Sequence, residues 1–521
     1  MTCYAVDLKS ITLSNWEHKE SPPSKSLEGI SIHHLQVPGK PQDLKNQLEQ
    51  YLGQEINEDL IHSIRQAIVS YYKSHHAPFL EVIAEEQDLS QGNLELIVVE
   101  GRLGAIKVDG NRWVKSEKLA KQMKLQSGAL IRQDKVAQSL AFINRNPFQH
   151  VDAIYAPGDQ IGTTDIELIT RDRFPLRVYA GIDNTGLSDT GNNRLFTGFN
   201  WGDAFFLGHI LSYQYTASSD FHAFQAHSVN YTAPLPWQHL FMAFGGYSTV
   251  HAKLPISQRG EGFSIQGSGR YIIPLPVWRK LLNDISFGFD FKRTNNTLNL
   301  QGTPSRFGDL VNLTQFTVGW NGSHSHPIVD TAYNLEIYFS PFEMVSDQSN
   351  EAFQTLRDGA KNKYVYGRAE LTNFFTLPLN FELEVDLQGQ AASENLLPSE
   401  QFWLGGVETV RGYSERVVSF DNAFLLNIEA FFPSTPFLLR KGNRVRDELK
   451  FLIFFDYGVG KNHKEEEDEP DHEYLMSVGV GARYLMGRYL SSEVDYGFKL
   501  HKNSIIGDDL GRLHFSLILS Y

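Results

Sequence analysis

Apolar and polar residues alternate in short segments from about residue 174 to the C-terminus. Alternation with a period of two predicts β-strands that have one apolar and one polar face. Because buried sandwiches also alternate, the number of segments matters more than any one of them. About sixteen segments, each about ten residues long and followed by a turn, are typical of an antiparallel transmembrane β-barrel. The segment 512–521 is the clearest, with the apolar set Leu513, Phe515, Leu517, Leu519 and Tyr521.

The connections between these segments alternate between short and long. Short turns are expected at 202–203, 234–237 and 486–488, and long loops at 295–310, 344–361 and 461–473. Barrels show this asymmetry because each rim faces a different compartment, so we expect the long loops outside the cell. In hydrocarbon an open sheet edge would leave backbone groups unpaired, so the sheet must close. A barrel of about sixteen strands encloses a water-filled lumen.

Residues 29–173 combine strand and helix patterns in an order that occurs twice. Each copy is predicted to contain a strand, two helices and two strands. These elements lie at 29–37, 42–52, 57–71, 79–84 and 94–99, and again at 103–108, from 116, 136–143, 151–155 and 164–170. A shift of 75 residues aligns Gly53 with Gly128 and Ile68 with Ile143. We therefore predict two α+β domains, 29–101 and 102–173, between a flexible arm at 1–28 and the barrel at 174–521.

The composition excludes several classes of protein. The chain has 521 residues and is 41% hydrophobic, and it lacks the run of about 20 apolar residues that a spanning helix needs. A net charge of -14 argues against nucleic acid as a partner. With 12% aromatic residues, 42 glycines and a single cysteine, the chain has the composition of a transmembrane barrel and no cysteine-based metal site.

Other candidate chemistry is weak. The acidic run 465–471 lacks the glycine and the spacing of a calcium loop and is typical of a solvated outer loop. The histidine pairs at 33–34 and 75–76 point in diverging directions, which disfavours a metal site. Serine, histidine and aspartate are abundant, but no nucleophile elbow sets them in a catalytic context. We expect neither an enzyme nor a cofactor.

The most informative stretch is 404–413, which reads Leu-Gly-Gly-Val-Glu-Thr-Val-Arg-Gly-Tyr and lies in a loop, 392–421, between two predicted strands. A second stretch, 454–458, reads Phe-Phe-Asp-Tyr-Gly within a strand whose odd positions from 451 to 459 are all apolar. That pattern directs Asp456 and Gly458 into the lumen. Arg411 can pair with Asp456 through two charge-assisted hydrogen bonds, while Gly412 and Gly458 permit close approach of the loop to the wall. The alternative is an ordinary loop tip and a solvated lumen carboxylate.

These two motifs resemble the paired signatures of the two-partner secretion transporters. In that family the Val-Arg-Gly-Tyr tip folds back into the lumen, and its arginine pairs with the aspartate of a Phe-x-Asp-x-Gly strand. The resemblance assigns the loop latch to Val410, Arg411, Gly412 and Tyr413, and the barrel-wall partner to Phe454, Asp456 and Gly458. Glu429 is a possible further polar partner in the lumen. The tandem domains resemble polypeptide-transport-associated (POTRA) domains.

The resemblance implies a transporter in the outer membrane of a Gram-negative bacterium, with the POTRA-like domains in the periplasm. It would export an unfolded, β-rich exoprotein of adhesin or haemolysin type without ATP, and capture it by strand addition to a sheet edge. Its other partners would be outer-membrane lipids and the barrel-assembly machinery, for which Tyr521 supplies a terminal aromatic signal. Two alternatives remain open. They are an assembly insertase of the same superfamily and a passive porin.

Overall fold

The computed structural model describes residues 6–16, 28–253, 259–277, 281–296, 307–438, 445–464 and 470–521. The chain divides into two compact units, Met1–Phe174 and Pro175–Tyr521. No helix in the described residues is long and apolar enough to cross a membrane.

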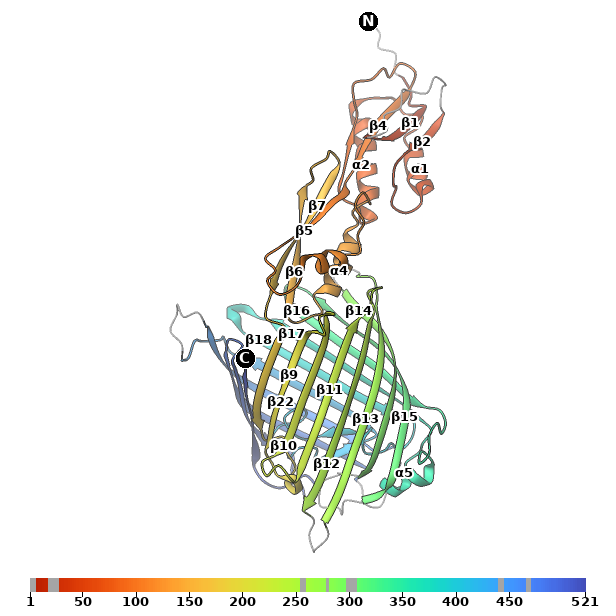
Figure 1. Ribbon diagram of the computed structural model, residues 1–521. Coiled ribbons are helices and arrows are strands. Elements are labelled where there is room, and N and C mark those ends of the chain that lie inside the picture. The colour runs from red at the N-terminus through yellow and green to blue at the C-terminus, as the bar shows by residue number, and fades with distance from the viewer. Residues whose placement is uncertain are drawn as a thin grey trace. The chain divides into compact units, whose positions relative to one another are not determined.

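In the described part of the second unit, sixteen strands form a closed antiparallel barrel, as the sequence predicted (Figure 1). The strands are β8 (Leu176–Asp183), β9 (Arg194–Ala204), β10 (His209–Ser218), β11 (Phe224–Pro234), β12 (Leu240–Lys253), β13 (Arg259–Pro274), β14 (Leu281–Asn296), β15 (Phe307–Ser325), β16 (Val329–Ser340), β17 (Tyr364–Thr376), β18 (Glu382–Ala392), β21 (Asn422–Phe431), β22 (Asp447–Lys461), β23 (His472–Met486), β24 (Leu490–Lys499) and β25 (Gly511–Ser520). Two short 3-10 helices, Ser188–Thr190 and Pro378–Asn380, lie in the connections. The barrel closes where β25 pairs with β8.

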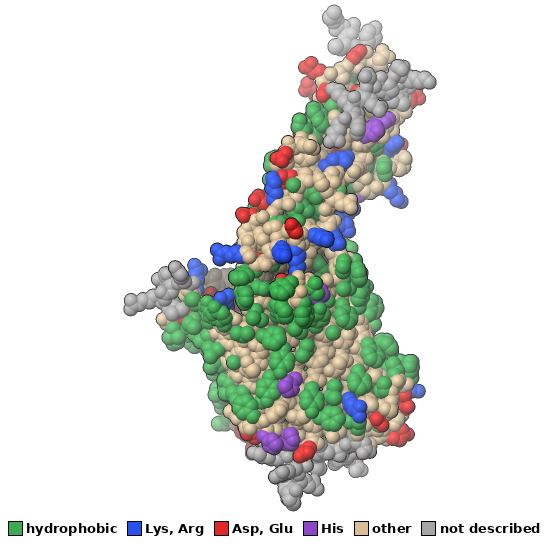
Figure 2. Space-filling view, in the orientation of Figure 1, with side chains coloured by type: hydrophobic (Ala, Val, Ile, Leu, Met, Phe, Trp, Pro, Cys, Tyr) green, Lys and Arg blue, Asp and Glu red, His purple; other side chains and the backbone are tan. Residues whose placement is uncertain are grey.

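Side chains alternate between the two faces of the barrel wall. On β22, Phe451 and Ile453 are 55% and 51% exposed on the outer face, whereas Asp456 is 0% exposed on the inner face. Hydrophobic side chains cover much of the outer wall in Figure 2. This pattern follows from the period-two alternation of the sequence.

Two connections fold into the lumen. One lies between β18 and β21 and contains a small hairpin of β19 (Phe402–Leu404) and β20 (Val418–Phe420). The other lies between β16 and β17 and contains α5 (Asn350–Leu356). In α5, Phe353 and Leu356 are buried against inward-facing residues of β15, β16 and β17. The long loop predicted at 344–361 lies in this connection, on the same rim as the other predicted long loops, and its apolar residues pack against the inner face of the barrel.

The other two predicted long loops are only partly described. The loop predicted at 295–310 begins and ends within β14 and β15, which pair as far as Asn296 and Phe307. Residues 297–306 of that loop lie outside the described residues. The loop predicted at 461–473, which includes the acidic run, has residues 465–469 outside them.

The first unit contains two α+β domains with the predicted order of elements. The first has β2 (Gly29–His33), α1 (Pro41–Glu49), α2 (Glu58–Ser74), β3 (Leu80–Ile83) and β4 (Asn93–Glu100), and the second has β5 (Arg102–Asp109), α3 (Ser116–Gln122), α4 (Gln133–Ile143), β6 (Gln149–Pro157) and β7 (Thr163–Asp172). Asn57 caps α2 by accepting a hydrogen bond from the backbone N–H of Leu60. Each domain has its own apolar core.

The first domain departs from the prediction in one element. Residues 10–15, which were predicted to belong to a flexible arm, form β1 (Ser10–Asn15) in the middle of a sheet with the order β2-β1-β4-β3. Ile11 and Leu13 are 0% exposed in the domain core. The prediction is wrong here because a strand of six residues gives a weak local pattern, and its partners are distant in sequence. Residues 1–5 and 17–27 of the predicted arm lie outside the described residues.

Candidate functional site

The loop between β18 and β21, residues 393–421, is the candidate site and is called the lumen loop below. Its hairpin of β19 and β20 carries the predicted latch motif at its tip. Apolar side chains pack the hairpin against inner-wall residues of β21 and β23, Leu425 and Leu475. The cluster contributed by the loop comprises Phe402, Leu404, Val410, Tyr413, Val417, Val418 and Phe420.

Arg411 lies at the tip and pairs with Asp456 on β22. Its Nε donates to Asp456 Oδ2 at 2.8 Å, and its Nη2 donates to Oδ1 at 2.7 Å. The backbone N–H of Arg411 also donates to Oδ2, at 3.0 Å. Arg411 is 3% exposed and Asp456 is 0% exposed. The structure thus brings the two predicted partners together in a buried, bidentate ion pair.

Other charged groups surround this pair. Arg411 Nη1 donates to Glu429 Oε1 on β21 and lies 3.5 Å from Asp495 Oδ2 on β24. Arg483 on β23 makes two hydrogen bonds to the same Asp495 carboxylate. Two guanidinium groups therefore share three carboxylates on the barrel wall. Predicted Glu429 is part of this set, whereas Asp495 and Arg483 were not predicted.

Phe454 lies beneath the Arg411 guanidinium. The Arg411 Cζ is 3.5 Å from the centroid of the Phe454 ring, and Phe454 is 4% exposed. The quadrupole of an aromatic ring attracts a cation at this distance. The first residue of the predicted strand motif therefore contacts the same cation that Asp456 binds.

Three glycines allow the loop to approach the wall. Gly412 has φ +91°, and a Cβ on it would lie 2.8 Å from the carbonyl oxygen of Gly497 on β24. A Cβ on Gly458 would meet the side chains of Leu404 and Val410 at 2.8 and 2.9 Å. Gly412 and Gly458 thus serve close approach as predicted, but at separate places. The backbone partner of Gly412 is Gly497, which the sequence did not reveal.

Tyr413 and His514 fix the loop beyond the arginine. The Tyr413 hydroxyl donates to the carbonyl oxygen of His501 at 2.7 Å and lies 3.0 Å from that of Met476. His514 on β25 accepts a hydrogen bond at Nε2 from the backbone N–H of Gly412 at 3.1 Å. A neutral imidazole that accepts at Nε2 has its proton on Nδ1, and this atom faces Glu415 at 3.5 Å.

Glu400 anchors the other side of the lumen loop. Its carboxylate binds Lys292 of β14 at 2.6 Å, and it accepts hydrogen bonds from Gln315 of β15 at 3.0 Å and Tyr366 of β17 at 2.8 Å. Arg368 donates to the Glu400 carbonyl at 2.9 Å. The Glu400 side chain is 1% exposed. In the strand order, β14 lies across the ring from β24, so the loop bridges two sides of the lumen.

Another buried ion pair joins the two inward connections. Arg357, which follows α5, makes two hydrogen bonds to Asp421, at 2.7 and 3.0 Å. Asp421 also accepts from the backbone N–H of Leu396 at 2.9 Å and of His463 at 3.0 Å. The end of the lumen loop is therefore fixed to the connection between β16 and β17.

The remaining predicted residue, Tyr521, lies away from this site. Its backbone exchanges hydrogen bonds with Val178 of β8, and its side chain is 74% exposed. Within the described ranges, no group of three histidine, cysteine, aspartate or glutamate residues is arranged to hold a metal ion.

Sequence comparisons identify the family. The model of the family described as haemolysin secretion/activation protein ShlB/FhaC/HecB matches residues 162–484, and that of the ShlB-type POTRA domain matches residues 30–101. The heme/hemopexin transporter protein HuxB of Haemophilus influenzae is 23% identical over 85% of this chain and 78% of its own length. The outer membrane transporter CdiB of Dickeya dadantii is 24% identical over 92% of this chain and 83% of its own length.

Solved structures share the fold. CdiB from Escherichia coli superposes with a TM-score of 0.79 at 18% identity, over 99% of this chain and 91% of that chain. BamA from Haemophilus ducreyi, in a form lacking POTRA domains 1-3, gives a TM-score of 0.51 at 14% identity, over 94% of this chain and 99% of that chain. The chain belongs to the haemolysin secretion/activation family and is an outer-membrane transporter of two-partner secretion, with its POTRA domains in the periplasm.

Proposed function

We propose that this transporter exports one unfolded, β-rich exoprotein without ATP, and that the lumen loop is the plug and latch of its pore. The observation that carries this proposal is the buried pair of Arg411 on the loop and Asp456 on the barrel wall, at 2.7 and 2.8 Å. A loop that spans the lumen must move for a polypeptide to pass. The ion pair would hold the closed state and reform after export.

The energetics of buried charges suit a latch. Breaking a buried ion pair by removing one partner costs about 3–5 kcal/mol, because the other charge stays buried without compensation. The pair therefore specifies one closed arrangement, in which both buried charges are compensated. When the loop moves outward as a unit into water, both partners regain hydration, so the transition is less costly than a mutation would be.

We assign capture of the cargo to the POTRA domains, by strand addition at a sheet edge. The candidate edges are those beside the second helix of each domain. They are β3, where Arg65 of α2 donates to the Val82 carbonyl at 2.8 Å, and β6, which packs beside α4. The β6 edge also carries Ile154, which is 52% exposed. An edge recognises an extended backbone rather than a particular sequence.

The proposal includes two further partners. The belt of exposed apolar side chains on the outer wall, such as Phe287, Trp320 and Ile337, would contact outer-membrane lipid. Tyr521 would act as the terminal aromatic signal that the barrel-assembly machinery reads. Replacing Tyr521 tests the second role through the amount of barrel that reaches the membrane.

The variant Arg411→Ala tests the latch. It leaves Arg483 to balance Asp456, Glu429 and Asp495, and at a cost of about 3–5 kcal/mol we expect it to reduce export of the exoprotein by at least about a hundredfold. The measurement is the exoprotein in the medium relative to barrel in the outer membrane. Arg416→Ala, on an exposed side chain of the same loop, is the matched control. Export by Arg411→Ala at the control level would refute the latch.

Two further measurements, POTRA-dependent secretion and planar-bilayer conductance, distinguish an exporter from an assembly insertase and from a passive porin. An exporter places its exoprotein outside the cell in a manner that depends on the POTRA domains, and its bilayer conductance is low while the lumen loop is closed. An insertase would instead change the assembly of other barrels. A porin would conduct and transport small solutes whether or not the domains are present.

A further inference from the structure

The first POTRA domain contains a strand that has no counterpart in the described part of the second domain. β1 lies between β2 and β4 and is parallel to both, with Ile11 aligned to Ile30 on one side and to Leu94 on the other. In the second domain β5 pairs directly with β7, also in parallel. The POTRA family model begins at residue 30, after β1. β1 is therefore an insertion into the middle of a sheet whose other strands form the family domain.

The space that β1 fills, between β2 and β4, is called the β1 slot. Because β2 and β4 are both parallel to β1, they are parallel to each other, which is the arrangement of β5 and β7. Without β1, β2 could thus close onto β4 as in the second domain. The topology therefore allows the domain two arrangements, one with a strand in the slot and one without.

The side chains of β1 define what the slot accepts. Ile11 and Leu13 are 0% exposed and pack in a core that includes Leu96 of β4 and Ile64 of α2. Thr12 lies between them on the other face of the sheet, opposite Glu95. The slot thus selects an extended strand with two apolar residues separated by one polar residue.

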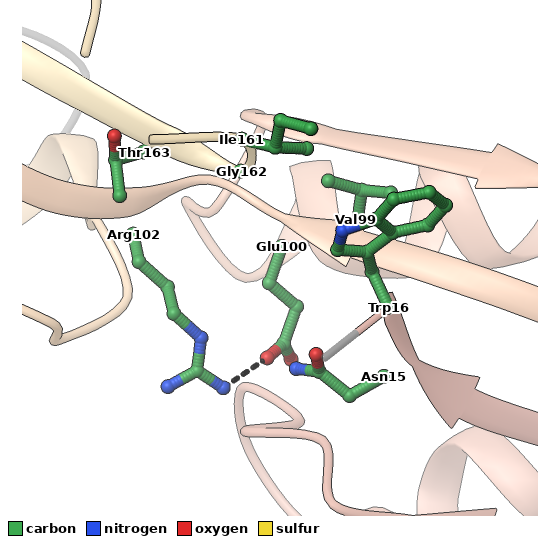
Figure 3. A pocket seen from close by; sticks show the side chains of 8 residues that line it. All are labelled: Asn15, Trp16, Val99, Glu100, Arg102, Ile161, Gly162 and Thr163. Atoms are coloured by element: carbon green, nitrogen blue, oxygen red, sulfur yellow. Dashed lines mark hydrogen bonds and ion pairs between the residues drawn. The ribbon is translucent and has the colours of Figure 1, made fainter. Parts of the chain in front are cut away.

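A pocket marks the end of the slot. Trp16 follows β1 and is 41% exposed, and it lines this pocket with Val99 at the end of β4 and Ile161 before β7 (Figure 3). On the opposite side of the pocket, Glu100 binds Arg102 at 2.7 Å. An occupant of the slot therefore ends at the junction of the two domains, where a bulky apolar residue is accommodated.

A second residue, Tyr72, also holds the Glu100 carboxylate in place. The buried Tyr72 hydroxyl donates to Glu100 Oε1 at 3.0 Å. Burial and the neighbouring Glu100 raise the pKa of Tyr72, so this donor keeps its proton. Because Arg102 and Tyr72 hold Glu100 in place, the apolar side chains of Trp16, Val99 and Ile161 are the part of the pocket that can adapt to an occupant.

We propose that the β1 slot is a strand-binding site for the exported chain, and that β1 occupies it in the resting transporter. This inference rests on the proposed function, in which the cargo reaches the domains unfolded. An incoming cargo strand with the pattern apolar-polar-apolar, followed by a bulky apolar residue, replaces β1 and pairs with β2 and β4 together. It gains two ladders of backbone hydrogen bonds, whereas addition at an edge supplies one.

Competition between β1 and cargo sets the selectivity. β1 is tethered, and a short tether gives an effective concentration of about millimolar. A single weakly matching peptide is therefore rejected. A β-rich exoprotein that presents many matching strands can compete, because its successive segments reach the slot repeatedly while it is held at the domain edges.

Peptide exchange tests the slot without any cargo. The probe is a synthetic peptide of residues 8–16 that carries Thr12→Cys and is used at about millimolar concentration. Its target is the full-length transporter with Cys3→Ser, which removes the native thiol, and Glu95→Cys, which places a thiol on β4. Thr12 and Glu95 are aligned on the exposed face, and neighbouring strands about 4.8 Å apart permit a disulfide. The matched control carries Glu167→Cys, which faces Lys107 in the parallel pair of β5 and β7. We expect the peptide to cross-link to Glu95→Cys at least tenfold faster than to the control.

Two results would overturn exchange. One is an equal cross-linking rate at the two positions, and the other is an unchanged rate when the peptide carries serine in place of Ile11 and Leu13. A disulfide between two transporter copies, each with Thr12→Cys and Glu95→Cys, would instead identify the occupant as a second copy of the chain and would also refute cargo binding.

A disulfide lock tests the cargo itself. The variant Thr12→Cys, Glu95→Cys in the Cys3→Ser background should export the exoprotein when reduced and lose at least tenfold of that export when oxidised. The control variant Lys107→Cys, Glu167→Cys, in which a disulfide would join β5 to β7, should export the exoprotein both when reduced and when oxidised. Full export by the oxidised β1 lock would refute the slot. Failure of the unmodified transporter to export any exoprotein would refute the proposed function instead.

Discussion

Two of the sites that anchor the lumen loop have opposite polarity. At its tip the loop contributes a cation, Arg411, to carboxylates on β21, β22 and β24. At its other anchor it contributes a carboxylate, Glu400, to Lys292 on β14 and to neutral donors on β15 and β17. Both of these anchoring side chains, Arg411 and Glu400, are almost fully buried. The tip anchor has several carboxylates that can replace one another, whereas among the described residues Lys292 at the other anchor is paired with Glu400 alone.

This difference predicts different consequences for single substitutions. The tip tolerates the loss of one wall carboxylate better than the loss of its arginine, because two guanidinium groups share three carboxylates. At the second anchor a single neutralisation leaves Lys292 buried without its partner. Loss of one wall carboxylate at the tip should therefore weaken the anchor only in part, whereas loss of the Glu400 charge should release the second anchor entirely.

The largest effect is expected for Glu400→Gln. The substitution keeps the shape of the side chain but removes the charge that compensates Lys292, which is 18% exposed. The cost of about 3–5 kcal/mol should release this side of the loop and raise the open fraction of the pore at least about tenfold. Planar-bilayer conductance of the purified transporter measures this, with Glu394→Gln on the same loop as control. Conductance equal to that control would show that the tip alone closes the pore.

A smaller effect is expected for Asp456→Asn. The variant loses the charge-assisted, bidentate contact with Arg411, but Glu429 and Asp495 still balance the two arginines. A hydrogen bond to a charged group contributes about 1.5–3 kcal/mol, so we expect export to fall by about tenfold. The exported exoprotein is compared with that of Asp386→Asn, which changes a lumen carboxylate on β18. If Asp456→Asn were as defective as Arg411→Ala, the tip would not be redundant.

The smallest effect is expected for Tyr413→Phe. The buried ring stays in the apolar cluster, but its hydroxyl no longer contacts the carbonyls of Met476 and His501. A loss of about 1 kcal/mol should slow export roughly two- to fivefold. Export rates of the two proteins at equal barrel levels measure this difference. A larger defect would indicate that the hydroxyl acts during export and not only in the closed state.

The amino-acid sequence by itself determined the architecture and one of the two anchors. Period-two alternation predicted a closed barrel because neighbouring residues on a strand face opposite environments. The repeated order of elements predicted two α+β domains. Arg411 and Asp456 could be paired because each belongs to a short local motif, and because the strand pattern around Asp456 directs it into the lumen.

Only the tertiary structure decided the second anchor, the inward turn of α5 and the place of β1. Lys292, Gln315 and Tyr366 come from three strands and meet Glu400 only after the barrel has closed. A lumen-facing polar residue has the same local pattern whether it meets water or a loop. For the same reason, six residues of a strand do not reveal which distant strands pair with them, since backbone hydrogen bonding is common to all partners.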